Sequence, residues 1–570
     1  MIKVAIIDKA PSRNKYANHF NFEFDEYHLS SIPLTKVLKK DVDININIDN
    51  YDFVILVGSE AAKYFAKATV SSTSGVLLFD KFLCCPNPAM LIFRPEGKPD
   101  FERTVKKIHE YVSGVVKDAS KCGTFIGITE ETEAINYLNE VLEHGDTYVA
   151  WDTETTSLYP RDGYVLGISI SYKVKDGRYI SSDCITDEVV LLLQKVADKF
   201  ETIFHNLKFD WKMIEYHFSI KFDPERVHDT MVEHYILDET AGSHGLKTLA
   251  IKFTDYGDYD SELDDFKKEY CKSKGILEED FTYDLIPWDV ISKYAAIDTA
   301  VTLELHLKFY PIIMAHPKLS KLYKELMMPS IVFLTKMEEV GIPLDKERML
   351  TSAQYLNDSL LEAKTALYDF DEIKNFESIK GSIFNPSSVV QLRSLLFDYV
   401  KLTPTGKLTK GGAVSTDAEV LEELKDQHPI PAHILKIRQL SKIKSSYLDK
   451  IIPAMDRDNR IRTNFNLTFT TSGRLSSSGK FNAQQIPRDD PIIKGCIKAP
   501  DGFKIIQQDL ATAEMYYAAV LSKDKDLQQV FINKGDFHSS IAKMVFDLGC
   551  AVEDVKKLHP VQRQAAKAVE

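Results

Sequence analysis

The sequence predicts a multidomain protein of the α/β class, and three observations support this prediction. The 570 residues are enough for roughly three or four domains of ordinary size. The composition, with 44% hydrophobic and 27% charged residues, is typical of a folded globular chain. Short apolar runs typical of strands alternate with helical patterns up to about residue 320, after which helical patterns dominate. We therefore expect domains at residues 1–120, 121–320 and 321–570.

The bulk properties also narrow the setting in which the protein acts. No apolar run reaches the length of about 18 residues that a membrane helix needs, so no membrane partner is expected. Seven scattered cysteines without a C-x-x-C pair favour a reducing cytoplasm. The net charge of −13 argues only weakly against nucleic-acid binding, because phosphate affinity depends on local basic patches.

The first domain is predicted to be an accessory α/β domain. Residues 2–7 and 51–58 have the pattern of buried strands, and a helix is expected from Ser59. The segment 1–120 contains neither a phosphate-binding loop nor a catalytic cluster, so no role is assigned to it.

The second domain is organised around a predicted buried strand at residues 148–157 that contains Asp152 and Glu154. Residues two apart on a strand point to the same face, so the two carboxylates converge. Two adjacent carboxylates beside an apolar run repel each other unless a cation lies between them. Pairs of divalent metal ions commonly fill this position, and they commonly serve phosphodiester chemistry.

Three further segments extend the pattern of the second domain. Residues 163–172 alternate like a strand paired with the first, and residues 202–210 form a short strand that turns into a helix near Asp210. Residues 288–302 are predicted to be helical. Tyr294 and Asp298 are four residues apart there and so share one helix face.

These motifs resemble the DEDD exonucleases, in the subclass that carries a tyrosine. The D-x-E motif ends in Glu154, an H-N-x-K-F-D motif ends in Asp210, and a Y-x-x-x-D motif runs from Tyr294 to Asp298. The resemblance implies a ribonuclease H-like 3′–5′ exonuclease with two metal ions. One would be held by Asp152, Glu154 and Asp298, and the second by Asp152 and Asp210. Tyr294 would orient the attacking water, and single nucleotides would leave the 3′ end of the DNA as monophosphates.

The ligand types favour magnesium, because the expected donors are hard oxygens without a competing histidine or cysteine set; manganese is the alternative ion. His205 and Asp229 are interpreted as supporting residues rather than ligands. The acidic run at residues 255–265 is interpreted as a solvated loop.

The third domain begins with predicted helices at 329–340, after 385 and after 415, the first stopped by Gly341 and Pro343. A helix at about 431–452 is basic. Its cations could grip a phosphate backbone or could face solvent, and the sequence leaves both alternatives open. The cations are Lys436, Arg438, Lys442, Lys444 and Lys450.

Residues 470–570 carry a second set of motifs. T-T-S-G-R-L-S-S at 470–477 and N-A-Q-Q-I-P at 482–487 precede a predicted strand at 503–509 that ends in Asp509, and a helix is expected from Leu510. This set resembles the palm of family A DNA polymerases, the relatives of bacterial DNA polymerase I. The order of the blocks and the extra N-terminal domain are most similar to a polymerase of tailed phages.

The resemblance assigns polymerase roles residue by residue. Asp509 would bind both polymerase metals, and Glu514 would exclude a ribose 2′-hydroxyl. Arg474 and Gln484 would contact the primer-template minor groove. Asp536-Phe-His538 is similar to a D-I-H segment, which places His538 among the substrate-binding residues. Arg563 and Lys567 match the R-x-x-x-K of motif B, which holds the incoming deoxynucleotide triphosphate.

Some positions depart from the family pattern. Gln485 stands where the family usually has asparagine, and Gln507 and Gln508 replace apolar or small residues before Asp509. Residues 510–513 also differ from the bacterial pattern, although the spacing to Glu514 is kept. These departures affect substrate contacts rather than the metal role of Asp509.

The sequence lacks a Tyr-Gly after Lys567 and a later H-D motif, so the expected right-hand polymerase is incomplete: a thumb, part of the palm and the start of the fingers. We expect the N-terminal portion of a phage replicative polymerase that proofreads, acts on primer-template and single-stranded DNA, and needs a second polypeptide to polymerise. The alternatives are a stand-alone exonuclease on a polymerase remnant and a non-catalytic DNA-binding subunit.

Overall fold

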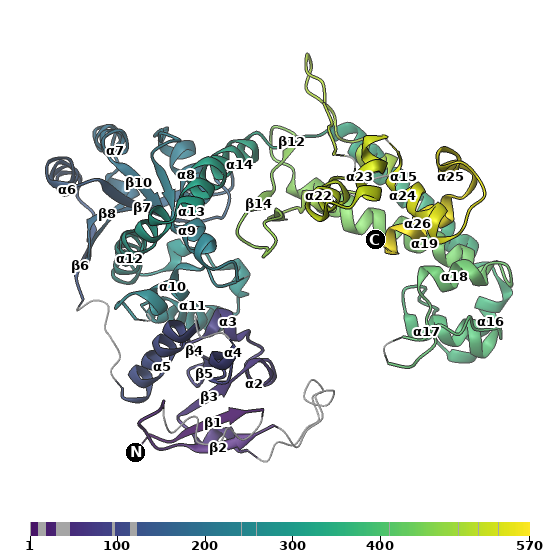
Figure 1. Ribbon diagram of the computed structural model, residues 1–570, viewed down its shortest axis with the longest axis horizontal. Coiled ribbons are helices and arrows are strands. Elements are labelled where there is room, and N and C mark those ends of the chain that lie inside the picture. The colour runs from purple at the N-terminus through teal and green to yellow at the C-terminus, as the bar shows by residue number, and fades with distance from the viewer. Residues whose placement is uncertain are drawn as a thin grey trace. The chain divides into compact units, whose positions relative to one another are not determined.

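The computed structural model describes residues 2–9, 19–29, 46–93, 97–114, 122–240, 242–257, 259–409, 411–487, 490–510, 512–533 and 535–569 (Figure 1). The chain forms two compact units, Met1–Ile497 and Lys498–Glu570, and each is described by itself.

The first unit begins with a five-stranded sheet of order β2-β1-β3-β5-β4, parallel except for β4. Alternate residues of β1 pack against helices on opposite faces: Val4 and Ile6 lie in a cluster with α5, and Ala5 and Ile7 in a cluster with α2. The predicted strands and the helix at Ser59 are therefore confirmed. The elements are β1 (Val4–Asp8), β2 (Asp25–His28), β3 (Phe53–Val57), α2 (Ser59–Phe65), α3 (Val70–Thr73), β4 (Leu77–Leu78), β5 (Phe82–Cys85), α4 (Met90–Phe93) and α5 (Lys98–Val112).

A second, six-stranded sheet has the order β11-β10-β7-β8-β9-β6. Strands β7, β8 and β9 form an antiparallel meander, β10 and β11 run parallel to β7, and β6 runs parallel to β9. This is the mixed, ribonuclease H-like α/β fold that the motifs predicted. Its strands are β6 (Thr124–Ile128), β7 (Tyr148–Thr155), β8 (Val165–Lys173), β9 (Asp176–Ser181), β10 (Glu201–Phe204) and β11 (Val227–Asp229).

Helices cover both faces of this sheet and so fix which side chains of β7 face which helix. Val149 and Trp151 lie in the large core cluster with α6 and α7, whereas Ala150 packs with Leu303 of α12. The carboxylates of Asp152 and Glu154 continue the Ala150 face. The helices are α6 (Glu131–His144), α7 (Asp187–Lys199), α8 (Leu207–Phe218), α9 (Thr230–Leu237), α10 (Leu246–Phe253), α11 (Ser261–Lys274) and α12 (Trp288–Ala315).

The solvated-loop interpretation of residues 255–265 is wrong in both halves of the segment. Helix α11 begins at Ser261, and the side chains of Tyr256 and Leu263 are buried in the core. Leu263 anchors α11 to the core and Tyr256 is buried before the helix begins, although the acidic residues suggested only solvation. Asp258 lies outside the described residues.

The rest of the first unit is mainly helical, as predicted. Helix α14 ends at Gly341, whose φ of +68° suits glycine, and α18 is capped by Asp417, whose side chain accepts from the Val420 N–H. The main elements are α13 (Pro317–Leu322), α14 (Met328–Val340), β12 (Ile342–Pro343), α15 (Lys346–Tyr368), α16 (Asp371–Lys380), α17 (Val389–Arg393), α18 (Ala418–Leu424), α19 (Ile430–Ile443), α20 (Asp449–Ala454), β13 (Arg460–Ile461), β14 (Asn464–Asn466), β15 (Ser476–Ser478) and α21 (Pro491–Lys494).

The second unit is helical, with a small core formed by Ala542, Val555 and Ala566. The predicted strand at 503–509 is wrong, because residues 503–510 have no regular structure. A strand is stabilised by ladder bonds to a neighbour, and none of the described residues of this unit offers one. The helices are α22 (Ala513–Ser522), α23 (Lys525–Ile532), α24 (Phe537–Val545), α25 (Val552–Leu558) and α26 (Pro560–Val569).

Among the helices of the described ranges, none combines the length and apolar character that crossing a bilayer requires.

Candidate active site

Three predicted carboxylates meet between β7 and α12. The ligand oxygens of Asp152, Glu154 and Asp298 all lie within 4.8 Å of one another. Glu154 and Asp298 are buried and Asp152 is half-buried. Strand alternation places the first two on one face, and α12 brings Asp298 opposite them. The structure therefore brings together the set that was expected to hold the first metal.

The fourth carboxylate, Asp210, is fixed by the residue between the two acids of β7. The backbone N–H and the hydroxyl of Thr153 both donate to Asp210 Oδ1, at 2.9 and 2.6 Å. Asp210 is fully buried near the start of α8. Sequence reasoning identified the carboxylate but not its partner Thr153.

The electrostatics of the site favour cation binding. Burial, reinforced by the other carboxylates, raises the pKa of Asp152 and of Glu154 well above their usual range. Burial raises the pKa of Asp210 to about 7, against the hydrogen bonds from Thr153. Burial also raises the pKa of Asp298, although Lys247 and Tyr259 oppose this. A divalent ion would relieve this repulsion, and hard carboxylate oxygens are the donors that magnesium and manganese prefer.

Two residues that sequence reasoning did not assign to the site contact Asp298. Lys247 of α10 and Tyr259 both donate to Asp298 Oδ1. The Lys247 ammonium also donates to the Tyr259 hydroxyl at 3.0 Å. No sequence signal placed them here, because Lys247 lies in a connecting helix and Tyr259 in the acidic run.

Tyr294 lies one helical turn before Asp298 on α12. The Lys247 Nζ lies 3.9 Å from the centroid of its ring, and the ring of Tyr259 is 6.2 Å away. Burial raises the pKa of Tyr294 well above its usual range, so the phenol stays protonated. It can therefore donate a hydrogen bond at neutral pH.

The two residues predicted to be supporting do hold the framework. Asp229 caps the start of α8 by accepting from the N–H groups of Asn206 and Leu207, at 3.0 and 2.9 Å, and also caps α9. His205 bonds Thr230 through Nδ1 at 2.9 Å, and burial lowers its pKa to about 3. Neither belongs to the carboxylate cluster.

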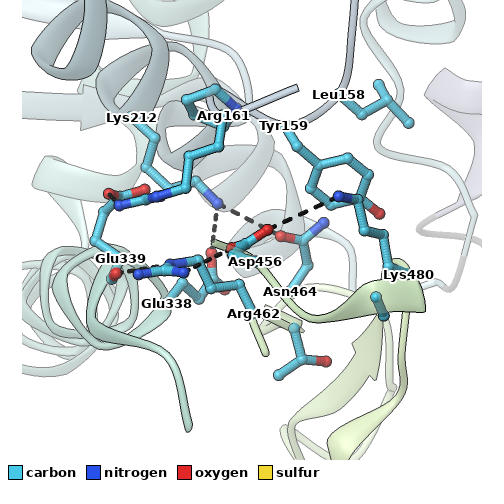
Figure 2. A pocket seen from close by; sticks show the side chains of 13 residues that line it. Leu158, Tyr159, Arg161, Lys212, Glu338, Glu339, Asp456, Arg462, Asn464 and Lys480 are labelled. Atoms are coloured by element: carbon cyan, nitrogen blue, oxygen red, sulfur yellow. Dashed lines mark hydrogen bonds and ion pairs between the residues drawn. The ribbon is translucent and has the colours of Figure 1, made fainter. Parts of the chain in front are cut away.

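A pocket next to α8 is lined by side chains that form ion pairs with one another (Figure 2). Lys212 of α8 pairs with Glu338 of α14 at 2.7 Å, and Arg161 pairs with Glu339 at 3.3 Å. Lys208, two residues before Asp210, also donates to Glu338 and to the Phe465 carbonyl. Because its charges pair with one another, we interpret the pocket as a structural link between α8 and α14.

Two of the cations in the predicted basic helix make contacts within the fold. Arg438 donates to the Thr416 carbonyl at 2.5 Å, and Lys444 pairs with Asp449 at 2.8 Å. Lys436, Lys442 and Lys450 are exposed. These three remain available to solvent or to a phosphate backbone.

The predicted primer-template residues of the first unit lie in loops. Arg474 is exposed, and its carbonyl accepts from the Thr470 hydroxyl at 2.6 Å. Gln484 is also exposed and donates to the Leu475 carbonyl at 3.2 Å. Arg474 and Gln484 are therefore both linked by hydrogen bonds to the segment 470–475.

The predicted polymerase residues of the second unit do not form a metal cluster among the described residues. Asp509 and Glu514 are both exposed, Asp509 in the irregular segment and Glu514 in the first turn of α22. Arg563 is instead paired with Asp536, with Nε at 3.0 Å from Oδ2 and Nη2 at 3.1 Å from Oδ1. His538 is half-buried in α24, and Lys567 is exposed on α26.

The six-stranded sheet and the carboxylate cluster beside it define the class of this part of the chain, a 3′-5′ exonuclease domain. Residues 125–314 match the 3′-5′ exonuclease family, and residues 354–570 match DNA polymerase family A. The chain is 48% identical to the DNA polymerase of Escherichia phage T5. The alignment of 595 residues covers 100% of this chain and 70% of that protein. It therefore belongs to DNA polymerase family A. The expected likeness to a phage enzyme is confirmed.

Bacterial relatives match over less of their length. DNA polymerase I of Pseudomonas aeruginosa is 29% identical over 74% of this chain and 45% of its own length, and that of Borreliella burgdorferi is 31% identical over 74% and 44%. The chain thus spans less than half of these two proteins. The polymerase domain of Pol1 from M. smegmatis, in complex with DNA primer-template and dNTP, shares the fold with a TM-score of 0.58 at 23% identity, over 78% of this chain and 70% of that one.

Proposed function

We propose that the chain is a divalent-metal-dependent 3′–5′ exonuclease that proofreads for a phage replicative DNA polymerase in the bacterial cytoplasm. The observation that carries this proposal is the convergence of Asp152, Glu154 and Asp298 within 4.8 Å, with Asp210 fixed to Thr153 beside them. The site would act on the 3′ end of single-stranded DNA and release monophosphates.

The chemistry assigns a role to each side chain. Bound magnesium or manganese would activate a water and neutralise the departing oxyanion. Asp152, Glu154 and Asp298 would hold one ion, and Asp152 with Asp210 the other. The protonated hydroxyl of Tyr294 would orient the attacking water. The oxygen-only donor set favours magnesium over zinc.

We further propose a domain organisation of accessory domain (1–120), exonuclease (121–320) and the N-terminal part of the polymerase (321–570). The family matches at 125–314 and 354–570 support the last two limits. In the polymerase part, Asp509 would bind metal, Glu514 would select deoxynucleotides, and Arg474 and Gln484 would contact the primer-template. His538, Arg563 and Lys567 would bind the incoming nucleotide.

Polymerisation should require additional protein surface, in our proposal a second polypeptide. Phe503, Ile506 and Leu510 are 73%, 83% and 80% exposed, and such apolar side chains need a covering partner before Asp509 can be held rigidly. If this is correct, the purified chain will degrade DNA but will not extend a primer.

The test follows a labelled single strand with the purified 570-residue chain and magnesium. We expect stepwise shortening from the 3′ end, loss of this activity in EDTA, and its loss in the Asp152→Ala, Glu154→Ala double variant. Undiminished cleavage by the double variant would refute the site. Primer extension by the purified chain would refute the need for a partner.

A further inference from the structure

Lys247 places a positive charge beside the carboxylates of the proposed exonuclease site. Lys247 donates to Asp298 Oδ1 and lies against the rings of Tyr294 and Tyr259, at 3.9 and 4.3 Å from their centroids. Its side chain is 26% exposed and that of Asp298 is 7% exposed. The Lys247 ammonium therefore lies against two tyrosine rings and one carboxylate rather than in solvent.

Asp298 Oδ1 also accepts from the Tyr259 hydroxyl. Two donors on one oxygen use up most of its capacity to accept, so the opposite oxygen is the better ligand for a metal ion. The two donors also fix the orientation of the Asp298 carboxylate.

We infer that Lys247 and Tyr259 are positioning residues of the exonuclease, which clamp Asp298 Oδ1 and support the ring of Tyr294, and that the Lys247 charge limits the affinity of the site for divalent ions. This inference rests on the proposed exonuclease function. It separates two effects of the lysine: its charge repels a nearby metal ion, and its contacts hold the residues that the reaction needs.

Removing the ammonium while keeping most of the aliphatic stem tests both effects. The Lys247→Met variant is expected to bind Mn²⁺ about three- to tenfold more tightly, because a positive charge beside Asp298 is lost. At saturating Mn²⁺ it is expected to release 3′ nucleotides about tenfold more slowly, because Asp298 and Tyr294 lose support. Mn²⁺ affinity is measured by electron paramagnetic resonance or calorimetry, independently of activity.

Two further variants separate charge from position. Tyr259→Phe removes a donor to Asp298 without changing charge, so the rate should fall while Mn²⁺ affinity stays within about twofold of the wild type. Lys247→Arg keeps the charge and should keep the Mn²⁺ affinity. Lys293→Met is the matched control: Lys293 lies next to Tyr294 on α12 but pairs with Glu262 at 3.7 Å, so neither quantity should change.

The outcomes are distinct. Unchanged affinity and rate in Lys247→Met would overturn the inference, as would a joint loss of Mn²⁺ binding and rate, which is the result expected if the lysine only holds the fold. A wild-type chain that neither binds Mn²⁺ nor degrades DNA would instead overturn the proposed exonuclease function. Melting curves of each variant check that it is folded.

Discussion

Thr153 donates both its backbone N–H and its hydroxyl to the same oxygen of Asp210, at 2.9 and 2.6 Å. Thr153 separates the two acids of the D-x-E motif, so one strand presents two carboxylates and anchors a third. These bonds join β7 directly to α8 at the site.

The Thr153→Val variant removes the hydroxyl donor but keeps the shape of the side chain. A hydrogen bond to a carboxylate favours its charged form, so its loss should raise the pKa of Asp210 above about 7. We expect the acidic limb of the exonuclease pH profile to move to higher pH and the rate at pH 7 to fall several-fold. Thr155→Val is the control, because the Thr155 hydroxyl bonds the Ser157 carbonyl instead. An unchanged profile would contradict the role of Thr153.

The buried Asp210 should make stability depend on pH in the absence of metal. Its pKa is about 7 in the fold and about 4 in an unfolded chain, so between these values the folded state holds more protons. Its contribution to the free energy of unfolding therefore falls as pH rises through this window. We expect the Asp210→Asn variant to gain melting temperature relative to the wild type between about pH 4 and pH 7 in EDTA, and magnesium to reduce the difference. A difference in melting temperature that shrinks with rising pH would contradict this prediction.

The Tyr294→Phe variant removes a hydroxyl from the site and no charge. If Tyr294 orients the attacking water, the exonuclease rate should fall about tenfold or more, while Mn²⁺ affinity stays the same. Single-turnover degradation and Mn²⁺ titration measure the two quantities. Equal losses in rate and metal affinity would show instead that Tyr294 supports the ligands.

Glu338 and Glu339 both line the ion-paired pocket, and Glu338 should contribute more to the stability of the fold than Glu339. The side chain of Glu338 is 1% exposed, and it pairs with Lys208 and Lys212 and accepts the Phe465 N–H at 2.7 Å. Glu338→Gln leaves the buried Lys208 and the half-buried Lys212 without this counter-charge and should cost about 3–5 kcal/mol of stability. Glu339→Gln breaks only a half-exposed pair with Arg161 and should cost about 1 kcal/mol or less. Denaturant melts compare the two, and equal losses would contradict this ranking.

Arg563 should hold the second unit together through Asp536. Asp536 also caps α24, so Arg563→Ala is expected to loosen both α24 and α26. Amide hydrogen exchange in these helices should become about tenfold faster, which corresponds to a loss of about 1.4 kcal/mol. Lys567→Ala, at an exposed position four residues later, is the control. Unchanged exchange in Arg563→Ala would show that the pair contributes little.

The sequence alone was sufficient to predict which carboxylates cluster and which elements carry them. Asp152 and Glu154 share a face because strands alternate, and Tyr294 and Asp298 share one because helices repeat. These are local rules, so spacing along the chain reveals them. The same reasoning located the helix capped by Asp417 and the helix ended by Gly341.

Only the tertiary structure placed Lys247 and Tyr259 on Asp298, across 51 and 39 residues of chain. No local periodicity encodes such contacts, because they depend on how α10 and the acidic segment pack against α12. The predicted strand at 503–509 is the opposite case, because the local pattern predicted an element that the tertiary structure does not form. Its apolar residues suit a strand, but a strand forms only where a neighbour supplies its hydrogen bonds, and the described residues of the second unit supply none.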